Sequence, residues 1–191
     1  MMEAIETKLE QLTDYGQHSN QVLNELVSTE YRYLRDVRVS LKNVLNSQHL
    51  SDKETSLLAL AIATNNGNQK LISRFKEMAT EAEASSEELA ETMACASLLA
   101  SNNVLYRFRH FTGKEKYNEL QAGIRMNIMA RPVLGKGLFE LISLAVSAVN
   151  GCEMCVNSHE ATVLEHGYTE EQIWDAIRLA SVVTSFGKIV F

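Results

Sequence analysis

Proline, cysteine and tryptophan are scarce in this chain, which contains one, three and one of them respectively in 191 residues. Because proline breaks helices, its near-absence favours a helical protein. No run of about eighteen uncharged apolar residues occurs, so no membrane span is expected. The first residues, MMEAIETKLEQ, lack the basic segment and apolar core of a secretory signal. We therefore expect a cytoplasmic protein.

Basic residues are in the minority, with 18 Lys and Arg against 24 Asp and Glu, a net charge of −6 and no basic cluster. Binding to nucleic acid or to an anionic membrane is therefore not expected. Hydrophobic residues make up 46% and charged residues 22% of the chain, as is typical of globular proteins. The length suffices for one packed core, and we expect a single domain over residues 1–191.

The spacing of apolar residues is helical. Within 20–46 they recur at steps of three and four, which predicts one long helix, and the alternation typical of strands is hard to find. Gly167 is expected to end a helix, and Pro132 with Gly135 and Gly137 marks a break. Three capping boxes of the form S/T-x-x-E/Q indicate helix starts, at Ser51 and Glu54, Ser85 and Glu88, and Thr169 and Gln172. The sequence therefore predicts an all-α fold.

An internal repeat relates two parts of the chain. Residues 57–101 align without a gap on 141–185, at an offset of 84, with ten identities in 45 positions. A shared Asn-Gly pair and coincident capping boxes favour a true duplication over the general similarity of amphipathic helices. We interpret 51–115 as a degenerate first repeat, 135–191 as the second repeat, and 1–50 as an added helical arm.

The two copies differ in their reactive side chains. Four such residues of the second copy align with unreactive ones of the first: Glu140 with Ser56, Cys152 with Asn68, Cys155 with Leu71, and His159 with Phe75. The scaffold can therefore be built without these four residues, and chemistry is the better reason for their presence.

The stretch NGCEMCVNSHE carries two of the cysteines. If Asn-Gly ends one helix and Cys152 opens the next, Cys152, Cys155 and His159 fall within about 60° of arc on one helix face. Free amides at a helix start favour a thiolate. The spacing suits a dithiol that closes to a disulfide, with His159 placed to move protons.

Two other interpretations of this stretch stay open. Cys152, Cys155 and His159 could supply three zinc ligands, with Cys95 or His166 as the fourth. Alternatively, the two thiols could pack as small hydrophobic groups. No second ligand pair has zinc-finger spacing, and a chain of this length does not need a metal to fold, so we favour redox chemistry and expect no metal.

Glu140 is the only ionisable residue in LFELISLAVSAVNGC, a segment that otherwise reads as buried. A buried carboxylate is costly unless a partner stabilises its charge. The alternative is that Glu140 occupies the first turn of its helix, where a negative charge is favoured.

Glu140, Cys152, Cys155 and His159 together form the pattern E-x11-C-x2-C-x3-H. This pattern resembles that of the AhpD-type alkyl hydroperoxidases of the carboxymuconolactone decarboxylase-like superfamily. FELISLAVSAVNGC and LLASNNVLYRFRHF are also similar to sequences of this family, so the resemblance covers most of the chain from about Thr55 onward. It implies an all-α, AhpD-like fold with internal duplication of a helical hairpin, assembled as a homotrimer or a dimer of trimers.

The resemblance further implies an antioxidant dithiol enzyme with no bound cofactor. Dihydrolipoamide would be the electron donor, carried on a lipoyl-bearing acyltransferase and recharged by dihydrolipoamide dehydrogenase. The dithiol would regenerate a partner peroxiredoxin, AhpC, and would also reduce organic hydroperoxides itself.

Residue roles follow from the same resemblance. Cys155 would attack the peroxide and pass through a sulfenic acid. Cys152 would donate a proton, resolve the intermediate into the Cys152–Cys155 redox disulfide and form the mixed disulfide with the partner, while Glu140 and His159 would act as a proton relay. Sequence alone does not establish which cysteine attacks. Some family members have a histidine at the position of Met154.

Two further functions remain as alternatives: a ligand-binding or decarboxylase-type relative that shares only the scaffold, and a non-catalytic redox- or zinc-dependent interaction protein. The other chemically conspicuous residues have structural interpretations. His166 is expected at a helix end, and Cys95 as a packed thiol. Arg107, Arg109 and His110 are expected to form a solvated or inter-subunit charge patch.

Overall fold

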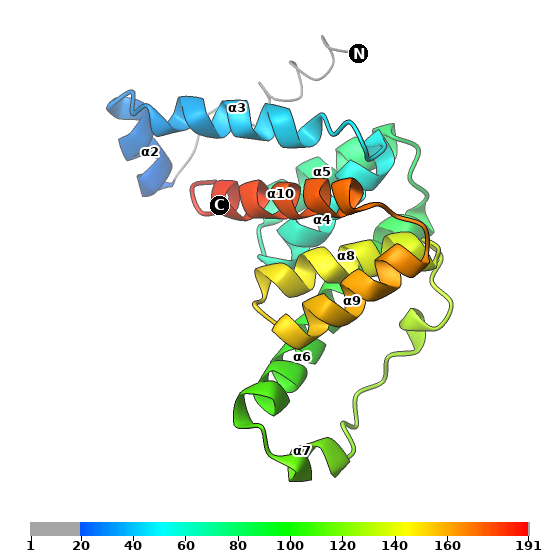
Figure 1. The fold of residues 1–191 in the computed structure, drawn as a ribbon. Helices are drawn as coiled ribbons and strands as arrows, with labels where there is room; N and C mark the ends of the chain where they lie inside the picture. Colours follow the sequence, from blue (N-terminus) through cyan, green and yellow to red (C-terminus); the bar gives the residue numbers. More distant parts are fainter. Residues whose placement is uncertain (1–19, 191) are drawn as a thin grey trace.

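A computed structural model describes residues 20–190, and every regular element in this range is a helix (Figure 1). The all-α prediction is therefore confirmed. None of the described helices is long and apolar enough to cross a membrane. The helices are α2 (Gln21–Ser28), α3 (Tyr33–Leu45), α4 (Asp52–Asn65), α5 (Gln69–Glu81), α6 (Ser86–Thr112), α7 (Glu115–Glu119), the 3-10 helix η1 (Asn127–Met129), α8 (Lys136–Val149), α9 (Glu153–Glu165) and α10 (Glu170–Gly187).

Helix boundaries follow the sequence repeat. Helices α8 and α9 begin and end 84 residues after α4 and α5, and α10 begins 84 residues after α6. The duplicated helical hairpin is thus present in the fold. The division into an arm and two repeats remains our interpretation. Of the arm, only α2 and α3 are described, and the expectation for MMEAIETKLEQ falls on residues 1–19, outside the described range.

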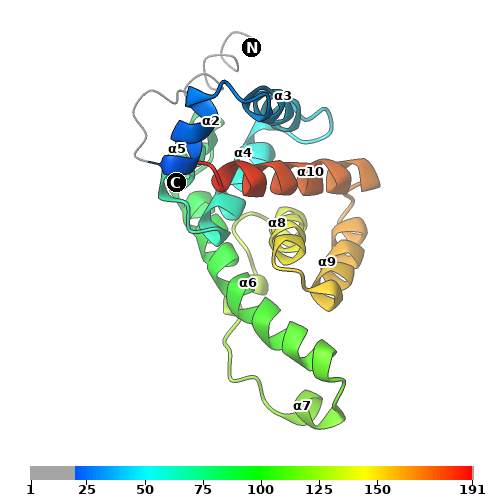
Figure 2. The same ribbon diagram turned by 90° about the vertical axis from the view of Figure 1, so that its left-hand side faces the viewer.

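Helices α4 and α8 form the centre of the fold (Figure 2). Every residue from 55 to 63 and from 139 to 147 is buried, which explains why both segments are almost uniformly apolar. Helices α5 and α9 fold back on α4 and α8, α10 packs on both central helices, and α6 packs on both of them and on α9. The 27-residue α6 extends past the other helices, with α7 at its far end (Figures 1 and 2).

In the described part of the arm, residues 20–46 form two helices, so the prediction of one long helix over 20–46 is wrong. The chain turns at Glu30, which has a φ of 47°. The Tyr31 amide donates to the carbonyl of Leu26 at 3.0 Å, a bond that closes the end of α2. Glycine usually marks this kind of helix end, and its absence here left the apolar periodicity as the only signal.

The other predicted helix boundaries are confirmed. All three capping boxes form, at the starts of α4, α6 and α10. Gly135, with a φ of 76°, precedes α8 and follows the break at Pro132. Gly167 ends α9 with a φ of 86°, and its repeat counterpart Glu83 follows α5 with a φ of 65°. Both helices are thus followed by a residue with a positive φ, which is glycine in one repeat and glutamate in the other.

We predict that Glu83→Gly raises the free energy of unfolding by about 0.5–1 kcal/mol, because glycine adopts a positive φ without the steric cost that a Cβ imposes. Urea denaturation measures the change. Ala82→Gly is the matched control, since Ala82 has a φ of −87° and gains no relief. A stabilisation by Ala82→Gly, or none by Glu83→Gly, would contradict the assignment of strain to Glu83.

Candidate active site

The turn between α8 and α9 places the two cysteines. Helix α8 ends at Val149, Gly151 adopts a φ of 67°, and Cys152 is the N-cap residue of α9. Cys155 is therefore in the first turn of α9, as the sequence predicts. The free amides at this helix start favour negative charge on a sulfur in that turn.

A network of amide side chains holds this turn in place. The Asn150 and Asn65 carboxamides donate to one another at 3.0 and 3.1 Å, which joins the ends of α8 and α4. Asn150 also donates to Asn103 Oδ1 at 2.8 Å, and Asn103 donates to Ser147 Oγ at 2.9 Å. Arg107 donates to the carbonyl of Asn150. Three helices thus fix the backbone immediately before the first cysteine.

Cys152 and Cys155 form a disulfide with a Cα–Cα distance of 5.3 Å. Both residues are buried, with 1% of Cys152 and 7% of Cys155 exposed. The small remaining exposure of Cys155 matters because this residue, and not Cys152, lines a pocket. The two sulfurs therefore differ in their access to a ligand.

Glu140 and His159 are in direct contact beside this disulfide. His159 Nδ1 lies 2.6 Å from Glu140 Oε2, and only 4% of the Glu140 side chain is exposed. Glu140 follows the first turn of α8, so the first-turn alternative does not account for it. Because an ionised carboxylate only accepts hydrogen bonds, Nδ1 carries the proton and Nε2 is left for proton transfer.

Lys136 is the second partner of Glu140. Its Nζ lies 2.6 Å from Glu140 Oε1, and it also donates to the Met129 carbonyl at 3.1 Å. Burial raises the pKa of Glu140, but hydrogen bonds from His159 and Lys136 outweigh burial, so this pKa lies below its usual value of 4.5. Glu140 is therefore a buried carboxylate that remains charged.

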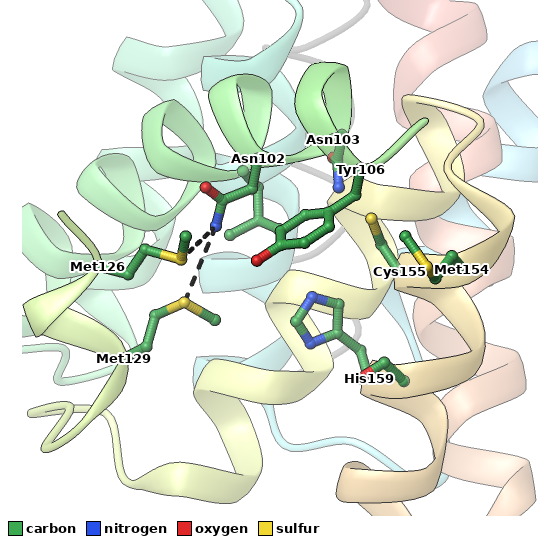
Figure 3. A pocket seen from close by; sticks show the side chains of 10 residues that line it. Asn102, Asn103, Tyr106, Met126, Met129, Met154, Cys155 and His159 are labelled. Carbon is green, nitrogen blue, oxygen red and sulfur yellow. Dashed lines mark hydrogen bonds between the residues drawn. The ribbon is translucent and has the colours of Figure 1, made fainter. Parts of the chain in front are cut away.

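A pocket of about 330 Å³ opens beside Cys155 and His159 (Figure 3). It lies between α6, the start of α9 and the segment that carries η1. Most of the surface that lines the pocket is apolar. Besides Cys155 and His159, the lining residues are Leu99, Asn102, Asn103, Tyr106, Met126, Met129, Met154 and Ser158.

Cys95 and His166 have the structural positions expected for them. The Cys95 thiol is buried, 3.5 Å from Ser143 Oγ, and burial raises its pKa to about 12. His166 caps α9, and its Nδ1 donates to the carbonyl of Thr162 at 2.9 Å. Neither joins the cysteine pair. Within residues 20–190, no group of three or more His, Cys, Asp or Glu side chains could hold a metal ion.

The expected patch of Arg107, Arg109 and His110 is only partly correct. Arg107 is partly buried and supports the Asn150 turn, so it does not belong to a solvated patch. Arg109 donates to the Leu120 carbonyl at 2.7 Å, and His110 Nε2 lies 3.5 Å from an exposed carboxylate, that of Glu153. Arg107 and Arg109 thus donate to backbone carbonyls outside α6, and no local sequence pattern indicates such contacts.

Several residues of the site were not predicted from the sequence, among them Lys136, Asn102 and Tyr106. Lys136 was detectable, since Lys and Glu four residues apart lie on the same helix face. Asn102 and Tyr106 come from α6 and reach the pocket only through the packing of α6 on α8 and α9. No local pattern in the sequence indicates that contact.

We predict that Lys136→Met lowers the free energy of unfolding at neutral pH by about 1 kcal/mol, because the buried Glu140 carboxylate loses one of its two partners. The expected loss is modest because the Lys136 side chain is itself partly exposed to solvent. The lowered pKa of Glu140 means that its charge stabilises the fold above pH 4.5 and that this contribution is lost as pH falls through the folded-state pKa. The deficit of the variant should therefore shrink in acid. Urea titrations from neutral to acidic pH measure it.

A double-mutant cycle is the control. In a Glu140→Gln background, Lys136→Met should have little further effect, because the charge that it pairs with is gone. An equal loss in both backgrounds would show that Lys136 stabilises the fold independently of Glu140.

Comparison with known proteins places this chain in a family. The family described as "Carboxymuconolactone decarboxylase family" matches residues 115–190. "Alkyl hydroperoxide reductase AhpD" of Anaeromyxobacter dehalogenans is 42% identical over 149 residues, 78% of this chain and 80% of that protein. Proteins of the same description are 38% identical over 160 residues in Coxiella burnetii, covering 82% and 90%, and 37% identical over 158 residues in Maricaulis maris, covering 83% and 91%. The chain therefore belongs to the AhpD-type, carboxymuconolactone decarboxylase-like proteins.

Proposed function

We propose that this protein is an alkyl hydroperoxide reductase whose Cys152–Cys155 dithiol reduces organic hydroperoxides. The observation that carries the proposal is the disulfide at the start of α9, next to a buried Glu140–His159 pair and a pocket that reaches Cys155. The names of the relatives agree with it. Both cysteines are present, which distinguishes the chain from a relative that shares only the scaffold.

Cys155 is the attacking residue in this proposal, because it lines the pocket and Cys152 does not. In the reduced protein, His159 accepts the Cys155 proton at Nε2, and Glu140 stabilises the resulting imidazolium. The thiolate attacks the terminal oxygen of the hydroperoxide. The O–O bond breaks, Cys155 becomes a sulfenic acid, and the alkoxide takes a proton from Cys152 to leave as the alcohol.

Cys152 then closes the cycle. Its thiolate attacks the sulfenic sulfur, the S–S bond forms, and the departing hydroxide takes the proton held by His159 to leave as water. Two thiols and one hydroperoxide thus give one disulfide, one alcohol and one water. The Cα–Cα separation of 5.3 Å lies in the range usual for disulfides, which supports a closed form of this pair.

The source of electrons is a finer part of the proposal. A dithiol reductant of the dihydrolipoamide type, on a lipoyl-bearing acyltransferase and recharged by dihydrolipoamide dehydrogenase, would reopen the disulfide through a mixed disulfide at Cys152. The reopened dithiol would also regenerate a peroxiredoxin, AhpC. We further propose a cytoplasmic homotrimer or dimer of trimers with no bound cofactor. These points rest on the family resemblance.

Thiol counting tests the core of the proposal. Reduced protein should lose two accessible thiols on addition of cumene hydroperoxide, and dihydrolipoamide should restore them. Cys155→Ser should abolish turnover. Stoichiometric zinc in the purified protein, with no peroxide consumed, would instead support the interaction-protein alternative.

We predict that His159→Phe lowers peroxide turnover by about 10²- to 10⁴-fold, because proton transfer loses its acceptor. Glu140→Gln should also lower turnover, because the imidazolium loses the carboxylate that stabilises it. The fold should survive, since the first repeat has Phe75 at the equivalent position. Steady-state peroxide consumption measures the effect, with circular dichroism as the check on folding. His166→Phe is the matched control and should retain the native rate. Native turnover by His159→Phe would require the relay to be abandoned.

A further inference from the structure

The pocket beside Cys155 contains polar groups that the proposed relay does not use. Tyr106 and Asn102 come from the same face of α6 and line the pocket together with His159. Figure 3 shows the Tyr106 hydroxyl directed into the space between Met129 and His159. These two residues are one helical turn apart, so α6 presents both to the same ligand.

Neither group has a nitrogen or oxygen hydrogen-bond partner among residues 20–190. No hydrogen bond joins the Tyr106 hydroxyl to any residue of the described range 20–190. Asn102 is 4% exposed, and its Oδ1 has no hydrogen-bond partner. Its Nδ2 reaches only two thioether sulfurs, Met126 Sδ at 3.4 Å and Met129 Sδ at 4.0 Å, which are weak acceptors. An unpaired polar atom is costly where it is buried, as Asn102 Oδ1 is, and a ligand with a polar end would satisfy it. Tyr106 is partly buried, and its hydroxyl can donate to the same ligand.

The rest of the pocket is suited to an apolar group. Leu99 is fully buried, and Met126 and Met129 are partly buried on a segment that is mostly irregular. Thioether side chains adapt to ligands of different shape. The volume of about 330 Å³ is at the small end of binding sites for organic molecules, which span about 300–1,000 Å³. A ligand with one compact apolar part and one polar end therefore fits best.

We propose that Tyr106 binds the hydroperoxide and stabilises the alkoxide that leaves when the O–O bond breaks. This inference rests on the proposed function. The organic group lies against Leu99, Met126 and Met129, and the peroxide group points toward Cys155. The Tyr106 hydroxyl donates a hydrogen bond to the oxygen bonded to carbon. That oxygen gains negative charge when the Cys155 thiolate attacks the other oxygen and the O–O bond breaks. Tyr106 keeps its own proton, because the alkoxide is protonated by Cys152.

The Tyr106 ring is supported by Arg109. The Arg109 guanidinium lies over the Tyr106 ring, 5.8 Å from its centre, and Arg109 is itself tied to the Leu120 carbonyl at 2.7 Å. The hydroxyl therefore extends from a supported ring, so that stabilising the departing oxygen needs little reorganisation.

Tyr106→Phe tests the proposal, because it removes the hydroxyl and keeps the ring. The fully reduced protein is mixed with cumene hydroperoxide, and the rate of thiol loss is measured in a single turnover. In parallel, the alkylation rate of Cys155 with iodoacetamide reports on the thiolate, and this reagent has no peroxide group for Tyr106 to bind. We expect the peroxide rate to fall roughly ten- to a hundredfold while the alkylation rate stays within twofold.

Tyr117→Phe is the matched control. Tyr117 is on α7, where its ring packs on Phe108 at 4.9 Å, away from the pocket residues. Both of its rates should equal those of the native protein.

Three other results would overturn the proposal, each for a different reason. An unchanged peroxide rate in Tyr106→Phe excludes a role for the hydroxyl. A parallel loss of both rates shows that Tyr106 supports the thiolate or the fold and does not bind peroxide. A native protein that alkylates normally but loses no thiols to hydroperoxide contradicts the proposed function itself, and the inference with it.

Discussion

The contact between Glu140 and His159 is the interaction on which the rest of the site depends. A carboxylate with 4% of its side chain exposed stays ionised only where other groups stabilise its charge, and here an imidazole and an ammonium each lie 2.6 Å from one of its oxygens. The same contact fixes the proton on His159 Nδ1 and leaves Nε2 available. The α8–α9 hairpin brings these groups together, and the Asn150 network holds its turn.

The two copies of the repeat use the same positions differently. Where the second copy has Cys152, the first has Asn68, whose side chain caps α5 by accepting from the Leu71 amide. Phe75 fills the core at the position of His159 and is fully buried. The first hairpin thus uses these positions for stability. In the second hairpin, Cys152 provides no such side-chain cap.

Much of this arrangement could be predicted from the sequence, because it is encoded locally. The capping boxes at Ser51, Ser85 and Thr169 give the helix starts, and the spacing from Cys152 to His159 gives a shared helix face. The sequence did not reveal the break at Glu30, where a glutamate takes the conformation that usually signals glycine. Nor did it reveal Tyr106 at the pocket, since that depends on how α6 packs against α8 and α9. Contacts between distant segments have no periodic signature.

The most direct test of the account is the pH dependence of thiolate formation in the reduced protein, followed by ultraviolet absorbance in the native chain and in Glu140→Gln. The account predicts a native midpoint below that of free cysteine, about 8.5. It also predicts an upward movement of the midpoint by on the order of one pH unit in Glu140→Gln, because the imidazolium that stabilises the thiolate loses its carboxylate. A midpoint that stays in place or moves down would contradict the central role of the Glu140–His159 contact.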